Sequence, residues 1–232
     1  MVAIAFRDTP DGTFNGYLAR AKIEKNVRVL LLPEMFGLTP AMHESAQSFA
    51  ADGYTTLVPN LFWRSVTHPD ALDYEEEDRR IAFDRLQAFD HSAAVEDIEL
   101  AAAELRGQAG ALPVVAIGHC IGGRLAVLAL PRTSLAGAVS YYGLGISQQG
   151  GELARLNKPA QLHYGTADEH VPMTEVKAVS ALAGGNPSIT IYCYDKAGHS
   201  FCNARRPMYD KTAACLVHER TLAFLDEIGR RA

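Results

Sequence analysis

A glycine-flanked cysteine turn constrains the fold of this chain more strongly than any other stretch. Residues 114–117 read Val-Val-Ala-Ile, which is typical of a short strand buried on both faces of a sheet. Residues 118–122 then read Gly-His-Cys-Ile-Gly, so a glycine stands two residues before and two residues after Cys120. This spacing is typical of the sharp strand-to-helix turn that exposes a nucleophile, because glycine avoids collisions on either side. The pattern therefore predicts Cys120 at a helix N-terminus, where the helix dipole favours a thiolate.

The same pattern also fits a structural turn with a buried cysteine, so the composition of the whole chain matters. The chain has 232 residues, 48% of them hydrophobic and 21% charged, which suits a single domain over residues 1–232. A formal net charge of −5 gives no support for a nucleic-acid partner. No apolar run approaches the roughly 20 residues that span a bilayer, and residues 1–8 do not resemble a signal peptide. We therefore expect a cytoplasmic protein without a membrane partner.

The cysteines and histidines argue against metal or disulfide chemistry. Four cysteines are too few for a disulfide framework, and none forms the Cys-x-x-Cys pair typical of zinc or redox sites. The histidines show no spacing typical of metal ligands, so we expect neither a metal nor a cofactor. We predict Cys193, Cys202 and Cys215 to be small buried residues, although Cys202 is close enough to His199 in sequence to border a site there. His119 is expected to pack beneath the turn.

Alternating strand and helix signals predict an α/β fold. The first thirty residues carry turn signals at 10–12 and 15–16, which favour an antiparallel hairpin whose second arm is 17–23. Later apolar runs predict strands, and periodic segments predict helices. The expected strands are 27–32, 54–58, 114–117, 135–141, 159–164 and 188–194, and the expected helices are 40–53, 75–86, 91–106, 173–183 and 208–228, with one more following Cys120. This alternation predicts a mostly parallel sheet with helices on both faces and an antiparallel N-terminal edge.

Four reactive side chains follow expected strands, at the sheet edge where active sites of this architecture gather. They are Glu34, Cys120, Asp168 and His199. The order nucleophile, acid, histidine is that of α/β-hydrolases. His199 would take the thiol proton of Cys120, and Asp168 would orient the imidazole. The alternatives are that Asp168 only caps a turn and that His199 is a hydrogen-bonded loop residue.

Glu34 is the unusual member of this set. It follows Pro33, where a turn residue is ordinary, yet its loop normally supplies one N–H group of an oxyanion hole. A carboxylate at this position can contact the thiol of Cys120 and keep it protonated until substrate arrives. Because a neutral thiol is protected from oxidation, we predict that Glu34 controls the resting state of Cys120.

Together these segments resemble the dienelactone hydrolase family, whose members are also called carboxymethylenebutenolidases. The resemblance covers nearly the whole chain, and it is clearest in Pro-Glu-Met-Phe-Gly at 33–37, Gly-His-Cys-Ile-Gly-Gly at 118–123, Gly-Thr-Ala-Asp-Glu-His-Val-Pro at 165–172 and Ala-Gly-His-Ser-Phe at 197–201. It implies an α/β-hydrolase fold with Cys120, Asp168 and His199 as a catalytic triad. It also implies that Glu34 is the carboxylate that controls the resting thiol.

The resemblance further implies how a substrate would be held. The N–H groups of Met35 and Ile121 would form the oxyanion hole. The aromatic side chains of Phe36, Phe83 and Tyr142 would line the pocket, although such residues more usually pack in a core.

Family members hold the carboxylate of the substrate with two arginines. Arg79 matches the first of these, although it also fits a solvated helix face. The second is expected four residues after His199, where this chain has Asn203 instead. Arg205 and Arg206 follow slightly later and are both candidates for the missing arginine.

The resemblance implies a cysteine-dependent hydrolase that opens a small carboxylated enol-lactone, converting dienelactone to maleylacetate in aromatic-compound degradation. Two alternatives stay open. One is hydrolysis of another small ester, lactone or thioester by the same residues, and the other is a non-hydrolytic protein that uses Cys120 as a reactive thiol for ligand binding or redox sensing. The sequence does not predict an oligomeric state, and a monomer is compatible with it.

Overall fold

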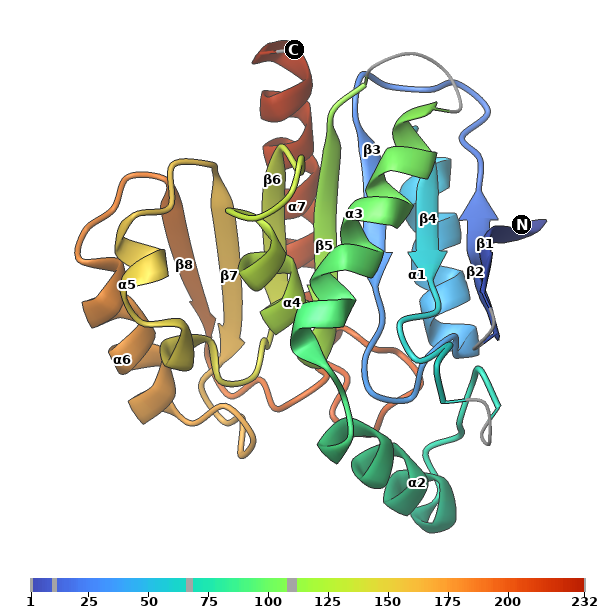
Figure 1. The fold of residues 1–232 in the computed structure, drawn as a ribbon. Coiled ribbons are helices and arrows are strands. Elements are labelled where there is room, and N and C mark those ends of the chain that lie inside the picture. Colours follow the sequence, from blue (N-terminus) through green and yellow to red (C-terminus); the bar gives the residue numbers. More distant parts are fainter. Residues whose placement is uncertain (1, 10–11, 66–68, 108–111, 232) are drawn as a thin grey trace.

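An eight-stranded sheet forms the centre of the computed structural model, which describes residues 2–9, 12–65, 69–107 and 112–231 (Figure 1). The strands are β1 (Val2–Thr9), β2 (Gly12–Ala19), β3 (Arg28–Leu32), β4 (Thr56–Pro59), β5 (Val114–His119), β6 (Gly137–Tyr141), β7 (Ala160–Gly165) and β8 (Ile189–Tyr194). Their order is β1-β2-β4-β3-β5-β6-β7-β8. The pairs β1–β2 and β2–β4 are antiparallel, and all pairs from β4 to β8 are parallel. The predicted sheet, including its antiparallel N-terminal edge, is confirmed.

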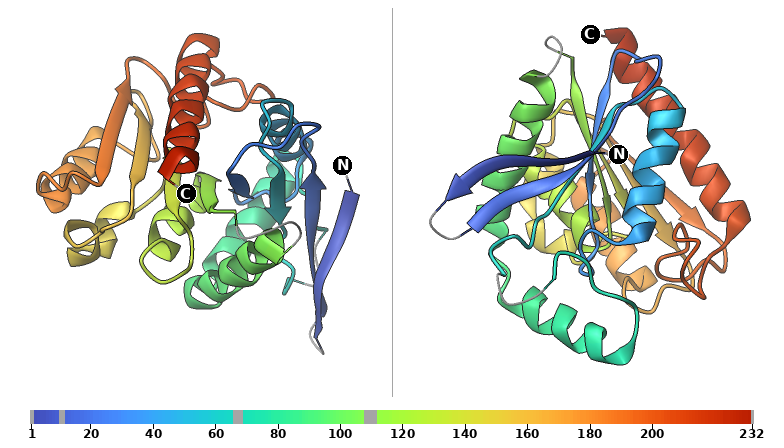
Figure 2. Two further views of the ribbon diagram at one scale, coloured as in Figure 1. Left: turned by 90° about the horizontal axis from the view of Figure 1, so that it is seen from above. Right: turned by 90° about the vertical axis from the view of Figure 1, so that its right-hand side faces the viewer.

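Helices cover both faces of this sheet (Figure 2). One face carries α1 (Pro40–Ala51) and α7 (Lys211–Arg231), and the other carries α3 (His91–Gly107), α4 (Ile121–Ala129), α5 (Gly151–Ala154) and α6 (Met173–Ala183), with the short 3₁₀ helix η1 (Ile146–Gln149) beside them. Helix α2 (Glu76–Gln87) lies beyond the carboxyl ends of the strands (Figure 1). None of the helices in the described residues is both long and apolar enough to cross a bilayer.

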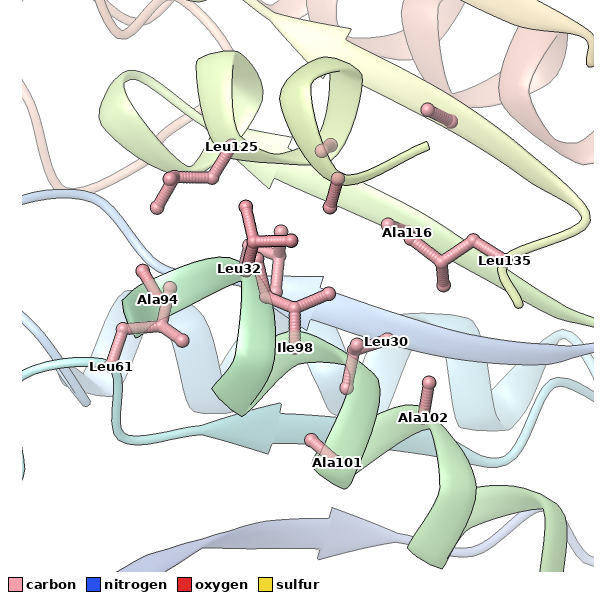
Figure 3. Packing of buried hydrophobic residues seen from close by; sticks show 14 of the residues in the cluster. Leu30, Leu32, Leu61, Ala94, Ile98, Ala101, Ala102, Ala116, Leu125 and Leu135 are labelled. Carbon is pink, nitrogen blue, oxygen red and sulfur yellow. The ribbon is translucent and has the colours of Figure 1, made fainter. Parts of the chain in front are cut away.

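The central strand β3 shows how the two faces share the core. Its side chains alternate, as the period of two along a strand requires. Leu30 and Leu32 pack with Ile98 of α3 on one face (Figure 3), whereas Val29 and Leu31 belong to the cluster formed with α1 and α7 on the other. All five residues of β3 are buried, which explains why strands of this kind read as continuous apolar runs.

Two predicted features of the chain ends are wrong in detail. The turn expected at 15–16 does not exist, because Gly16 lies inside β2 and pairs with β1 and β4 on either side. A side chain at Gly16 would collide with the backbone of β4, so this glycine marks a close strand approach. The second arm therefore ends at Ala19 rather than at 23, and the turn signal at residues 10–11 lies outside the described residues.

The last helix begins three residues later than predicted, at Lys211. Asp210 accounts for the shift, because its Oδ1 accepts a hydrogen bond of 3.0 Å from the N–H of Ala213 and so caps the helix. Met208 is half exposed in the turn before that cap.

Cys193 and Cys215 are exposed, which corrects the prediction that they are buried.

The turn between β5 and α4 has the strained geometry that the glycine spacing predicts. Cys120 adopts φ 56° and ψ −117°, a left-handed backbone conformation that residues other than glycine rarely adopt. A Cβ atom on Gly118 would overlap the carbonyl group of Gly122, and one on Gly122 would overlap the carbonyl oxygen of Leu32. The turn is therefore held by direct backbone contact with the end of β3, which places Cys120 at the carboxyl edge of the sheet.

Replacing Gly122 with alanine is expected to destabilise the fold by about 3 kcal/mol or more, since the neighbouring groups are backbone and overpacking of a core already costs 1–3 kcal/mol. Thermal or urea unfolding measures the loss. The matched control is Gly107→Ala, because no atom lies within 4 Å of a Cβ built there and Gly107 ends a helix. Equal stability of the two variants would contradict the packing role of Gly122.

Candidate active site

Asp168 and His199 come together beside the carboxyl ends of β7 and β8. The Oδ2 atom of Asp168 lies 2.8 Å from Nδ1 of His199. Its Oδ1 atom accepts hydrogen bonds of 2.8 and 2.9 Å from the N–H groups of His170 and Val171. Asp168 therefore caps a turn with one oxygen and contacts the imidazole of His199 with the other, and its catalytic role stays a prediction.

The environment of Asp168 favours its ionised form. Its side chain is fully buried, which alone would raise its pKa. The hydrogen bond and positive charge of His199, together with the two backbone N–H groups, outweigh burial and lower the pKa. A carboxylate held in this way stabilises the protonated imidazole of His199.

His199 is largely buried and interacts with both Asp168 and Cys120. Burial alone would lower the pKa of His199, but hydrogen bonds and negative charge from Asp168 and Cys120 raise it well above its ordinary value. The ring of His170 lies 4.8 Å from that of His199 in an edge contact.

Tyr142 supports His199 from the protein interior. Its side chain is fully buried, its ring lies 5.0 Å from that of His199, and its hydroxyl lies 2.8 Å from Nδ1 of His119. His119 is itself buried beneath the turn, where it was expected. Tyr142 was predicted as a pocket wall, but the structure places it behind His199 and not among the residues that line the cavity in front of Cys120.

A cavity of about 170 Å³ opens in front of Cys120. It is smaller than the roughly 300–1,000 Å³ that drug-sized ligands occupy, so it suits a small molecule. Helix α2 closes one side of it with Arg79, Phe83 and Leu86. The remaining walls come from the loops that follow the strands, and they include Glu34, Met35, Phe36, Leu144, His170, His199, Ser200 and Arg206. Phe83 is half exposed in spite of this position.

The walls include some of the predicted substrate-binding residues and add others. Met35 lines the cavity, and Ile121 is the first residue of α4, directly after Cys120. Sequence reasoning missed Leu144 and His170 as wall residues. His170 stands two residues after Asp168, which is the signal that could have located it. Cys202, which is close enough to His199 in sequence to border the site, lines a different cavity, between α1 and α7.

Only one of the two candidate arginines after His199 reaches the cavity. Arg205 is exposed, pairs with Glu44 of α1 and is not among the residues that line the cavity. Arg206 lines the cavity, with its guanidinium 4.6 Å from the ring centroid of Tyr74. Its Nε and Nη1 atoms are buried and have no hydrogen-bond partner among the described residues. Arg206 therefore offers unused donors to a ligand.

Arg79 reaches the same cavity from α2. Its residue is exposed, and its Nε donates a hydrogen bond of 2.9 Å to the carbonyl oxygen of Tyr74. The side chain is thus held in the cavity wall, at a place that is open to solvent. Within the residues that the structure describes, no three His, Cys, Asp or Glu side chains converge as a metal ion would require.

Glu34 is buried at the inner end of the cavity, but its hydrogen-bond partners are not those expected. Its Oε1 atom accepts hydrogen bonds of 2.8 Å from the hydroxyl of Tyr74 and 3.3 Å from Nδ2 of Asn203. Among the hydrogen bonds of the described residues, none joins Glu34 to Cys120. Burial raises the pKa of Glu34, and the hydrogen bond from Tyr74 and the charge of Arg206 oppose that rise.

The sheet order, the two helical layers and the nucleophile turn define an α/β-hydrolase fold. A family model described as the dienelactone hydrolase family matches residues 14–229. The chain therefore belongs to the dienelactone hydrolase family, whose members are ester and lactone hydrolases.

Individual relatives agree with this assignment. A carboxymethylenebutenolidase of Pseudomonas putida is 32% identical over 198 residues, which are 85% of this chain and 84% of that protein. Carboxymethylenebutenolidase 1 of Cupriavidus pinatubonensis is 28% identical over 219 residues, or 92% of each chain. A crystal structure from Klebsiella pneumoniae, of a protein assigned as a dienelactone hydrolase, has a TM-score of 0.80 and 21% identity, and covers 97% of this chain and 98% of that one.

Removing the charge of Asp168 tests the electrostatics of this site. In Asp168→Asn the pKa of His199 is expected to fall by about one to three units, because the carboxylate that stabilises the imidazolium is gone. A histidine-resolved NMR titration measures the shift. Asp52→Asn is the matched control, since Asp52 forms a similar 2.8 Å pair with His218 elsewhere. An unchanged pKa of His199 in Asp168→Asn would contradict the assigned electrostatic role.

Proposed function

We propose that this chain hydrolyses a small carboxylated enol-lactone, opening dienelactone to maleylacetate with Cys120 as the nucleophile. The observation that carries the proposal is Arg206, whose unpaired nitrogen atoms lie in the wall of the cavity that also holds Cys120. A buried guanidinium without a partner is satisfied by an anionic ligand, and a carboxylate matches its geometry. Relatives named as carboxymethylenebutenolidases support this choice of substrate.

Three residues carry the proposed chemistry. Sγ of Cys120 attacks the ring carbonyl carbon, and the tetrahedral intermediate collapses by breaking the ring C–O bond, so that the enolate leaves and a thioester remains on Cys120. His199 holds the proton taken from the thiol and returns a proton to the leaving group. His199 then accepts a proton from water, whose oxygen attacks the thioester and releases the thiol. Asp168 stabilises the imidazolium in both steps.

The developing negative charge on the carbonyl oxygen needs donors in fixed positions. We assign these to the N–H groups of Met35 and Ile121. The contact between Gly122 and the end of β3 supports this assignment, because it brings the loop that contains Met35 against the first turn of α4. The helix dipole of α4 acts in the same direction at Ile121.

Substrate orientation follows from the cavity walls. The carboxylate lies between Arg206 and Arg79, and Phe36 forms an apolar wall with a ring that also contacts Tyr74 at a centroid distance of 4.9 Å. The reaction belongs to the degradation of aromatic compounds, and a reducing cytoplasm suits its thiol nucleophile. No residue in this scheme requires a cofactor.

The first experiment compares lactone hydrolysis by the native chain and by Cys120→Ala. Native protein is expected to open cis- or trans-dienelactone with a kcat/KM well above that for p-nitrophenyl acetate, because the simple ester lacks the carboxylate. Cys120→Ala is expected to lose at least about three orders of magnitude in kcat for the lactone, since no nucleophile remains. A clear native preference for the simple ester would contradict the proposed substrate.

The two neighbouring arginines give a matched test of carboxylate binding. Arg206→Ala is expected to raise KM for dienelactone by about 10- to 100-fold, the effect of losing a hydrogen bond between charged groups. KM for p-nitrophenyl acetate should stay within about twofold. Arg205→Ala is the control and should behave as the native chain, because Arg205 is bound to Glu44 outside the cavity. Equal effects of Arg206→Ala on both substrates would refute a carboxylate contact.

A further inference from the structure

A second cavity, separate from the one in front of Cys120, lies between α1 and α7 on the face of the sheet that these helices cover (Figure 2). Its volume is about 430 Å³, and none of the described residues lines both cavities. His119 and Tyr141, the last residues of β5 and β6, belong to its wall. A protein cavity of about 150 Å³ already holds a benzene molecule. The cavity between α1 and α7 therefore has room for a substituted single ring.

One polar group in this wall has no partner. His119 is only 3% exposed, and its Nδ1 atom lies 2.8 Å from the hydroxyl of Tyr142, whereas its Nε2 atom is buried without a hydrogen-bond partner. Among the described residues that line the cavity, no other buried side-chain nitrogen or oxygen is left unpaired. The neighbouring hydroxyl of Tyr141, for example, lies 2.8 Å from Oγ1 of Thr221. Because a buried unpaired nitrogen is unfavourable, a ligand with a polar group at Nε2 of His119 gains affinity.

The charges around the cavity select an uncharged ligand. Burial lowers the pKa of His119 to about 3, so its ring is neutral near pH 7 and its Nε2 atom is either a donor or an acceptor. No arginine or lysine is among the described residues that line the cavity, which do include Glu219 and Glu44, the partner of Arg205. A carboxylate would therefore lose its water here without a cation to compensate it. A hydroxyl group suits either form of His119, because it both donates and accepts.

The rest of the wall suits an aromatic ring. Met42 and Phe49 of α1 and Val217 of α7 line the cavity, and the structure buries all three side chains. The ring of Tyr141 lies 4.9 Å from that of His119 in an edge contact. Aromatic rings and thioethers both make favourable contacts with a further ring. An apolar ring that carries one hydroxyl group therefore matches both parts of the wall.

We propose that this cavity binds an uncharged phenol, with the ring packed against Met42, Phe49 and Val217 and the hydroxyl paired with Nε2 of His119. This site is additional to the proposed lactone reaction, because neither Cys120 nor Arg206 lines it. The bound hydroxyl completes a chain of hydrogen bonds that runs through His119 to Tyr142.

Calorimetric titration of the full-length native protein with three related molecules tests the proposal. The probes are p-cresol, toluene, which lacks the hydroxyl, and p-toluate, which has a carboxylate in its place. We expect p-cresol to bind with one-to-one stoichiometry and at least about tenfold more tightly than toluene, because toluene leaves Nε2 of His119 unpaired. An excess of p-toluate should not displace p-cresol. Nuclear Overhauser effects from the ring protons of p-cresol to the methyl groups of Met42 and Val217 locate the bound molecule.

Substitutions in the wall separate the hydroxyl contact from the cavity itself. His119→Phe keeps a ring but removes Nε2, so p-cresol and toluene should then bind within about twofold of each other. Ala214→Phe fills the cavity from α7 and should remove the binding of both. Ser45→Phe fills it from α1 and serves the same purpose where Ala214→Phe does not fold. Ala103→Phe is the matched control, since Ala103 is an exposed residue of α3, and it should bind p-cresol as the native chain does.

Three results overturn the proposal. They are the absence of saturable p-cresol binding, equal affinities of the native chain for p-cresol and toluene, and p-cresol binding that survives the filling of the cavity. The titrations use no lactone. A failure of the proposed hydrolysis therefore appears as absent turnover of dienelactone and leaves the binding of p-cresol unchanged, so the two conclusions are tested separately.

Discussion

The whole site depends on a backbone contact between the nucleophile turn and the end of β3. Neither Gly118 nor Gly122 leaves room for a single methyl group, so the strand, the turn and the first turn of α4 lie against one another without intervening side chains. This contact forces Cys120 into a left-handed conformation, which the surrounding packing must stabilise at a cost of about 1–3 kcal/mol. The same contact places the thiol at the carboxyl edge of the sheet, beside the loop that contains Glu34 and Met35. Loss of the contact would separate Cys120 from both.

Two buried carboxylates near this turn have opposite electrostatics, and their donors explain the difference. Asp168 accepts from two backbone N–H groups and from the charged ring of His199, so its pKa is lowered in spite of burial. Glu34 accepts from a phenol and an amide, both neutral, so burial prevails and its pKa is raised. Neutral donors stabilise a carboxylate less than charged ones do. The site therefore combines a permanent negative charge behind His199 with a carboxyl group whose charge depends on its neighbours.

Sequence reasoning predicted the layer order of the fold and the residues at the strand ends, because both depend on local patterns. Buried strands read as apolar runs, and Cys120, Asp168 and His199 each follow one of them. The errors concern contacts between distant segments. The role of Gly16 is set by β4, some forty residues away. Tyr74 was not predicted as a site residue, because no local sequence pattern marks a tyrosine before α2 as the partner of Glu34.

The segment after β8 shows how three local turns bring Arg206, rather than Arg205, to the cavity. Successive backbone hydrogen bonds join Asn203 to Ser200, Arg206 to Asn203 and Tyr209 to Arg206, at 2.8, 3.0 and 3.0 Å. This repeat of three residues returns the chain to the same side at each step, as in a 3₁₀ helix. Asn203 and Arg206 consequently both reach the site, while Arg205 between them faces Glu44. A polar group that fixes Glu34 and a cation that faces the cavity are thus supplied by separate residues.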